Sequence, residues 1–374
     1  MNVDGRIYFL DAARAILMFL GIPYHVAMIY VIGNDWEFAR SFETSAALSA
    51  LADFIHVFRM PLFFMVAGYF SMLMLGRREP GRWFGGRLFK LGVPLLAAGL
   101  LLNPLTLMVQ DDSAMLLAQL GDHWLAHLWF LPTLIYLCAV LALMQATPLN
   151  RMFERLVHRM VANPVAGIAG FLLFATCLSG AGSMLGTRVP DKFVLTTTLL
   201  SALGFLPYVL LGAAMRLDRR LLAFMSTCSW TSLALTLVPA VFLTSTSWGG
   251  TAMNMLRVLA IAAVCFGSAR VLLTVCRTVL DRPSQRIRNI ADASFTVYLV
   301  HFPLLNAFYK FVEPANLPVG VEFVLLVASV SVASYAAHML VARSDTLKVL
   351  FNGATLKRRA VRNGEANQVA QAFK

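Results

Sequence analysis

The sequence predicts an all-α integral membrane protein: a polytopic bundle of about ten transmembrane helices with both termini in the cytoplasm. Three observations predict this fold class. The 374 residues are 59% hydrophobic and 13% charged, with a mean hydropathy of +0.72. Apolar runs of about twenty residues, the length that a helix needs to cross a bilayer, recur along the chain. Basic residues gather in alternate connections between these runs.

The first run is predicted to stay in the protein rather than to be removed as a signal peptide. It carries Asp11 and Arg14 and lacks a small-residue cleavage site. The later runs follow at intervals that leave only short connections. In chain order, the predicted spans are 7–33, 46–75, 88–109, 125–146, 163–181, 194–215, 226–246, 252–276, 289–311 and 321–342.

The connections with many arginines are the even-numbered ones, which predicts that they and both termini face the cytoplasm. We expect one membrane domain over 1–342 and a basic cytoplasmic tail over 343–374. The net charge of +12 is explained by this topology, so binding to nucleic acid is not expected. The five cysteines lie singly without C-x-x-C spacing, and we expect them to act as small hydrophobic residues.

Ionisable side chains inside a span are costly and usually face a bundle interior or a cavity, so they are the candidate functional residues. In the first span, Asp11, Arg14 and His25 follow helical spacing and are predicted to lie on one face, with Arg14 and His25 about 16 Å apart. Further candidates come from three other spans: Asp53, His56 and Arg59 in the second, His127 and Trp129 in the fourth, and Tyr298 and His301 in the ninth.

His25, His56 and His301 are predicted to lie at one depth, about 12 to 15 Å below the outer edge, with His127 nearer that surface. Pro23, Pro61 and Pro303 lie close by, and each removes a backbone donor and can open its helix. This pattern favours a common cavity. Alternatively, each histidine packs between helices, and Asp11 with Arg14 forms an ion pair at the inner interface.

A neutral imidazole can take the proton of a hydroxyl that attacks an acyl carbonyl, and His25 is the best candidate for this base. Arg82, Arg87 and Lys90 are predicted to form a cationic mouth that would attract a phosphorylated acyl carrier, although positive-inside topology explains them equally well. No permanently bound cofactor is expected. Metal binding is not predicted either, because few carboxylates or thiolates lie at the depth of the histidines.

Several segments resemble the membrane acyltransferase 3 family: YFLDAARAILMFLGIPYHVAMIY (8–30), ADFIHVFRMPLFFMVAGYFSML (52–73), AHLWFLPTLIY (126–136), ASFTVYLVHFPL (293–304) and LKVLFNG (347–353). The resemblance is closest to its branch of osmoregulated periplasmic glucan succinyltransferases. It implies a ten-helix, multi-pass enzyme of the bacterial inner membrane that moves succinyl groups from cytoplasmic succinyl-CoA to hydroxyls of a periplasmic glucan.

The same resemblance implies roles for individual residues. His25 would be catalytic together with Asp11 and Arg14, while the candidates of the second, fourth and ninth spans would line the cavity. Family members often carry an R-x-x-R pair at the start of the third span, where this chain has Arg87 and Lys90. A lysine keeps the charge but not the bidentate geometry for a phosphate.

Two other functions agree with the same residues. One is O-acetylation of another cell-envelope polysaccharide, since only a succinyl group needs a cation such as Arg59 for its carboxylate. The other is a proton-coupled transporter with Asp11, His25, His56 and Arg59 as the relay. The expected partners are the bilayer, the acyl-CoA donor, the glucan acceptor and the glucan synthesis machinery.

Overall fold

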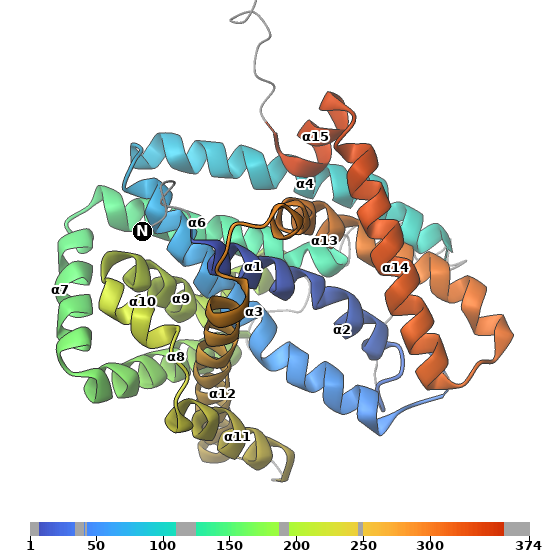
Figure 1. Ribbon diagram of the computed structural model, residues 1–374. Helices are drawn as coiled ribbons and strands as arrows, with labels where there is room; N and C mark the ends of the chain where they lie inside the picture. Colours follow the sequence, from blue (N-terminus) through green and yellow to red (C-terminus); the bar gives the residue numbers. More distant parts are fainter. Residues whose placement is uncertain are drawn as a thin grey trace, which may run out of the picture.

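The computed structural model describes residues 7–33, 41, 43–109, 125–186, 194–245 and 250–354. Within these ranges, every regular element is a helix (Figure 1). The helices are α1 (Tyr8–Phe19), α2 (Gly21–Met28), α3 (Ala46–Leu75), α4 (Pro80–Val109), η1 (Ala126–Trp129), α6 (Phe130–Ala146), α7 (Leu149–Ala162), α8 (Pro164–Gly186), α9 (Val194–Leu217), α10 (Arg219–Met225), α11 (Trp230–Ser245), α12 (Thr251–Leu280), α13 (Gln285–Val312), η2 (Glu313–Ala315), α14 (Val319–Val341) and α15 (Asp345–Asn352).

The predicted helical membrane bundle is confirmed, but the predicted number of about ten spans is not. In the described part of the chain, 8 helical segments are long and apolar enough to cross a membrane, or up to 9 if a bent pair counts as one span. Helix α13, which contains the predicted span 289–311, is long enough but is not among them. Its arginines near the start and its buried polar side chains make it less apolar than the others. The side on which the termini lie stays a prediction.

The predicted span 226–246 contains helix α11, and a bend separates this helix from α10 before it. Helix α10 ends at Met225, and α11 begins at Trp230 with its axis bent by 59° from that of α10. Arg270 of α12 stabilises this break, because its Nε donates to the carbonyl of Phe224 at 3.2 Å and its Nη2 to that of Thr227 at 2.7 Å. An arginine from a distant helix thus satisfies carbonyls that the helix end leaves without a helical partner.

The first predicted span is also broken, where α1 ends and α2 begins at Leu20 and Gly21. Pro23 has no N–H and cannot donate to a carbonyl four residues earlier. The helical hydrogen bonding nevertheless continues past Leu20, because the N–H of Tyr24 donates to the Leu20 carbonyl at 3.2 Å, and the two pieces form one candidate span, Tyr8–Met28. That Asp11, Arg14 and His25 line a single face stays a prediction. The two ends of the span meet different neighbours, with Lys90 near Arg14 and His301 near His25.

Helix α4 begins at Pro80, eight residues before the predicted third span. The Glu79 carboxylate accepts the N–H groups of Gly81 at 2.9 Å and Arg82 at 2.7 Å, and a proline is favourable in a first helical turn. Those two backbone bonds, led by that of Arg82, lower the pKa of Glu79. Arg82 and Arg87 consequently lie on helix α4 and not in the connection before it, whereas the cationic mouth stays a prediction.

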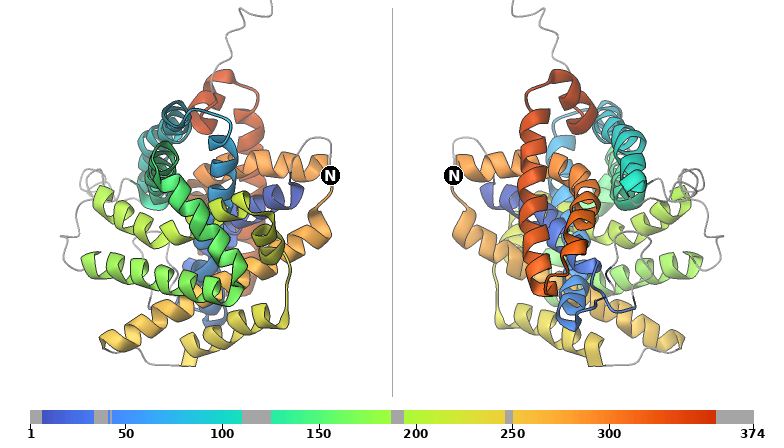
Figure 2. Two further views of the ribbon diagram at one scale, coloured as in Figure 1. Left: turned by 90° about the vertical axis from the view of Figure 1, so that its left-hand side faces the viewer. Right: turned by 90° about the vertical axis from the view of Figure 1, so that its right-hand side faces the viewer.

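Helix α15, within the predicted tail, packs against α4, α13 and α14. It ends at Gly353, whose φ of 58° is left-handed and favours glycine. A Cβ at Gly353 would also overlap the backbone of Lys90. The tail therefore begins as a helix fixed over α4, which the views of Figure 1 and Figure 2 both show. Its residues 355–374 lie outside the described residues.

Helices α3 and α9 cross at a contact made by two glycines. A Cβ at Gly68 would overlap the Val209 carbonyl, and one at Gly212 would overlap the Met65 carbonyl. Small residues at such a crossing let two membrane helices approach until their backbones touch. This contact fixes the position of α3, which carries Arg59.

We expect Gly212→Leu to destabilise the protein by about 1 to 3 kcal/mol or more, because the larger side chain must push α3 and α9 apart. Thermal unfolding of the purified protein in detergent measures the effect. Gly170→Leu on α8 is the matched control, since a Cβ there meets nothing within 4 Å. Equal melting temperatures for the two variants would contradict the close crossing.

Candidate functional site

Four elements that are distant in the sequence bring three histidines and an arginine together. They are α2 with His25, α3 with Arg59, η1 with His127 and α13 with His301, and all four side chains are buried. The ring centroids of His25 and His301 are 5.2 Å apart, and those of His127 and His301 are 5.5 Å apart. We call these four residues the central cluster. It confirms that the second, fourth and ninth predicted spans meet the first.

The protonation pattern of neutral His301 follows from its hydrogen bonds. Its Nδ1 lies 2.7 Å from the carbonyl oxygen of Tyr298 and 3.2 Å from that of Val297. A carbonyl oxygen only accepts, so Nδ1 carries the hydrogen and Nε2 carries the lone pair. This Nε2 is buried, with no hydrogen-bond partner among the described residues. His301 thus presents a basic nitrogen inside the cluster.

His127 is oriented by a proline on another helix. Pro303 cannot donate to the carbonyl of Leu299 four residues earlier, so that oxygen is left for another donor. His127 Nε2 lies 3.2 Å from it and therefore donates to it, which leaves the lone pair of His127 on Nδ1. The hydroxyl of Tyr298 donates to the carbonyl of His127 at 2.5 Å. Proline at 303 thus frees the Leu299 carbonyl, which fixes an imidazole 172 residues from Leu299 in the sequence.

These bonds correct the predicted depth of His127. We expected it near the outer surface, but η1 turns the chain inward and the side chain is buried against His301. Ala126 adopts a φ of 39° in this turn. The neighbouring Trp129 does not join the cluster: it stacks on Phe205 at 6.0 Å and is half-buried, as a packing residue.

Arg59 is a buried cation that has no carboxylate partner within the described ranges. Its guanidinium carbon lies 4.6 Å from the centroid of the Tyr24 ring, a cation–π contact. Its Nε has no hydrogen-bond partner there. A buried charge is costly unless it is paired, so this arrangement is suited to an anionic ligand or to negative charge that develops during a reaction.

Gly21, at the break between α1 and α2, makes room for this guanidinium. A Cβ at Gly21 would lie 2.8 Å from Arg59 Nη1 and 3.6 Å from His301 Nε2. The Arg59 guanidinium and the basic Nε2 of His301 therefore lie close together, next to Gly21. Gly21 and Tyr24 were not predicted as site residues, although both lie close to His25 in the chain. A small or aromatic residue in an apolar span gives no signal of such a role.

We expect Gly21→Ala to lower activity by about tenfold while the melting temperature changes little, because the added methyl displaces a flexible guanidinium and not the backbone. Acyl-transfer rates and thermal unfolding of the same preparation test this. Gly92→Ala on α4 is the control, since a Cβ there meets nothing within 4 Å. An unchanged rate for Gly21→Ala would show that the position of Arg59 is not important.

Asp53 and His56 lie on the exposed side of α3, and not within the cluster. Tyr24 links them to it: its hydroxyl lies 3.1 Å from His56 Nδ1, and its ring stacks on the His56 ring at 5.7 Å. The structure therefore places His56 at the rim of the site, with Tyr24 and Arg59 between it and the buried histidines.

Asp11 and Arg14 lie outside the central cluster, nearer to α4. They pair with each other at 3.6 Å, and Arg14 lies 5.5 Å from the ring of Phe70 on α3. Arg14 is also close enough to Arg87 and Lys90 of α4 for their charges to interact. We call Arg14, Arg87 and Lys90 the cationic cluster; Arg82 is exposed one turn before it. At helical rise, Arg14 is about 16 Å from His25.

The central cluster holds the parts that acyl transfer to a hydroxyl requires: buried imidazoles, two of them with lone pairs defined by backbone bonds, and a cation without a carboxylate partner among the described residues. The sequence model of an acyltransferase domain family matches residues 7–342. The chain belongs to this acyltransferase family. Since the match spans nearly the whole helical bundle, the family's activity is expected from this membrane domain.

Individual relatives of this acyltransferase carry a more specific name. Glucans biosynthesis protein C of Escherichia coli K12 is 28% identical over 381 residues, covering 95% of this chain and 96% of the relative. The protein of the same name from Shigella dysenteriae serotype 1 shows the same identity and coverage. No solved structure matches the chain. Membership of an acyltransferase family favours an enzyme over the transporter considered from the sequence.

Proposed function

We propose that this membrane acyltransferase is an O-succinyltransferase of the bacterial inner membrane, which moves succinyl groups from succinyl-CoA to hydroxyls of osmoregulated periplasmic glucans. The observation that carries the proposal is Arg59, a cation buried beside the histidines and without a carboxylate partner among the described residues. A succinyl group ends in a carboxylate and needs such a partner, whereas an acetyl group does not. The name of the relatives supports glucan as the acceptor.

His25 is the proposed general base. It takes the proton of the acceptor hydroxyl as the oxygen forms a bond to the thioester carbonyl carbon. The carbon–sulfur bond then breaks, and the thiolate of coenzyme A leaves and takes up a proton, so that the histidine returns to its neutral form. Arg59 holds the succinyl carboxylate throughout these steps.

His301 is the proposed second proton acceptor, because its Nε2 lone pair is directed by backbone bonds and lies beside the Arg59 guanidinium. The proton can then move away from the reacting oxygen by passing from His25 to His301. The ring separation of 5.2 Å suits such a transfer through one bridging water or hydroxyl.

We expect His301→Asn to lower succinyl transfer about tenfold or more while preserving the fold. An amide can replace the anchoring bond, as Asn306 shows on the same helix by donating to the carbonyl of Phe302 at 2.8 Å. It cannot replace the basic nitrogen. Rates measured across pH test this role, and wild-type activity in the variant would contradict it.

The cationic cluster is the proposed site for the phosphates of succinyl-CoA, with Arg82 guiding the carrier from outside it. Its distance from His25 of about 16 Å requires the donor to reach into the bundle with its long pantetheine arm. Lys90 offers a point charge where many family members have arginine, so a phosphate there is bound by charge more than by paired hydrogen bonds. Asp11 orients Arg14 within this cluster.

Mass spectrometry of periplasmic glucans tests the function directly. Cells that lack the protein are complemented with the wild type, and the glucans are expected to gain succinyl mass. Unmodified glucans together with acetyl groups on another envelope polysaccharide would replace the proposed substrate and acyl group. Extracts can further be assayed with succinyl-CoA and acetyl-CoA in parallel, where a preference for acetyl-CoA would contradict the role of Arg59.

A further inference from the structure

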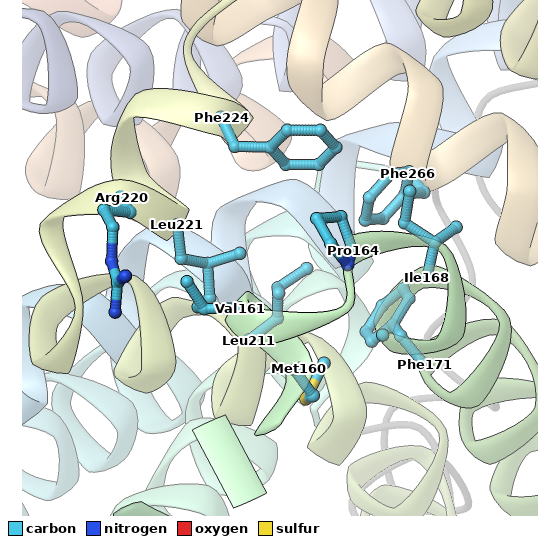
Figure 3. A pocket seen from close by; sticks show the side chains of 11 residues that line it. Met160, Val161, Pro164, Ile168, Phe171, Leu211, Arg220, Leu221, Phe224 and Phe266 are labelled. Atoms are coloured by element: carbon cyan, nitrogen blue, oxygen red, sulfur yellow. The ribbon is translucent and has the colours of Figure 1, made fainter. Parts of the chain in front are cut away.

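A cavity lies away from the central cluster, at the corner where α7, α8 and α10 meet. Its volume is about 190 Å³, and apart from Arg220 its lining is apolar (Figure 3). The aromatic walls are Phe171, Phe224 and Phe266, from α8, α10 and α12. An apolar cavity of about 150 Å³ is already large enough to bind benzene, so this one can hold a stretch of hydrocarbon chain.

The surroundings of the cavity indicate the side from which such a chain would come. Helix α7 is amphipathic and crosses between the ends of α6 and α8, as Figure 1 shows. Of its residues, only Val157 is buried, while the side chains of Met152 and Leu156 are 62% and 53% exposed. In a membrane protein, an exposed apolar helix face of this kind lies in the boundary between headgroups and acyl chains. The cavity lies directly beside this helix, since Met160 and Val161 of α7 line it.

A cation is held in place at the cavity edge. Arg220 donates to the Asp218 carboxylate through Nη2, which lies 3.1 Å from Oδ2, and through Nε, which lies 3.4 Å from Oδ1. Because Asp218 fixes the guanidinium from one side, its remaining N–H groups stay available for another acceptor. Arg159 and Arg219 are exposed nearby in the chain segments that form the cavity. The edge is thus basic, while the interior is apolar.

We propose that this cavity binds an anionic diacyl phospholipid, with part of one acyl chain between α8 and α10 and the phosphate at Arg220. The combination of an apolar interior, a positioned guanidinium and an amphipathic helix at bilayer level matches the two halves of such a molecule. The bound lipid fills the corner between α7 and α10 and so ties the surface helix to the spans. This inference is independent of the acyl group that the enzyme transfers.

Native mass spectrometry of the full-length protein tests the site, with phosphatidylglycerol and phosphatidylcholine of identical acyl chains as the two probes. We expect the wild type to retain phosphatidylglycerol at least tenfold better than phosphatidylcholine after washing with detergent. Arg220→Gln should remove this preference, and Leu221→Trp, which fills the cavity, should abolish retention of both lipids. Arg282→Gln, an exposed arginine in the α12–α13 connection, should retain phosphatidylglycerol like the wild type.

Two results would overturn the proposal. One is equal retention of both lipids by the wild type, which would leave Arg220 without a headgroup to bind. The other is wild-type retention by Leu221→Trp, which would place the lipid elsewhere. Val161→Phe fills the cavity from the opposite wall, on α7, and provides the same test if Leu221→Trp does not fold. Thermal unfolding without added lipid identifies a variant that is simply misfolded.

Discussion

Replacing His25 by alanine is expected to lower succinyl transfer by about 10²- to 10⁴-fold, the range that a positioned general base contributes. His25 is buried in the central cluster, with the ring of His301 at 5.2 Å and that of Phe302 at 5.4 Å. Phe302 carries no base, and His301 is held at its own position by backbone bonds through Nδ1, so neither replaces the base where His25 lies. The loss should appear in the turnover rate more than in the affinity for succinyl-CoA, because the cationic cluster that is proposed to bind the donor lies about 16 Å away.

The measurement is a steady-state assay with succinyl-CoA and isolated glucan, at matched amounts of protein in the membrane. His338→Ala is the matched control. His338 is also a histidine within a span, but its Nδ1 lies 3.2 Å from the hydroxyl of Thr296 on the α13–α14 contact, outside the central cluster. We expect this variant to stay within a few-fold of the wild type. Equal losses in both variants would mean that histidines of the bundle act through stability, and the proposed base would be wrong.

Arg59→Met is expected to lower transfer from succinyl-CoA by about 100-fold or more while the protein keeps or gains thermal stability. The expected loss of activity and the expected gain in stability have the same physical cause. Within the described ranges Arg59 is buried without a carboxylate, so the folded protein bears the cost of its desolvation without an ion pair in return. An apolar side chain of similar length removes that cost, and it also removes the partner for the succinyl carboxylate.

A comparison of donors makes this test specific. With acetyl-CoA, which has no second carboxylate, we expect Arg59→Met to lose far less activity than with succinyl-CoA. Arg59→Lys should be intermediate, because it retains the charge but not the planar guanidinium that lies over Tyr24. An equal loss with both donors would reassign Arg59 to the transition-state charge of either reaction. A strong loss of thermal stability would instead indicate a structural role.

The first span shows most clearly which properties can be predicted from the sequence and which cannot. Spacing alone placed Asp11, Arg14 and His25 on one helix, and the structure keeps all three in the same span. The break at Gly21 then separates their surroundings, so that His25 meets His301 while Arg14 lies near Lys90. A proline in the sequence indicates that the hydrogen bonding of a helix can be interrupted there. The direction of a resulting bend depends on which neighbours supply the missing hydrogen bonds.

The same contrast holds for the prolines of α3 and α13. Pro61 leaves the carbonyl of Val57 without its helical donor, and the thiol of Cys265 lies 3.1 Å from that oxygen. Cys265 was expected to act only as a small hydrophobic residue, because its partner lies 208 residues away. His127 was misplaced in depth for a similar reason. No local pattern relates it to Leu299, whose free carbonyl holds its ring inside the bundle.

The sequence by itself determined that this is a helical membrane protein, where its apolar segments lie, and which polar side chains are costly enough within them to mark a site. These properties depend on the transfer of each segment from water to lipid, and this free energy adds up along the chain. Only the tertiary structure decided which nitrogen of His301 is basic, that Arg59 has no acidic partner in the described ranges, and that Gly21 makes room for it. Those properties arise from contacts between helices, because inside a bilayer each freed backbone group and each buried charge must find its partner on another helix.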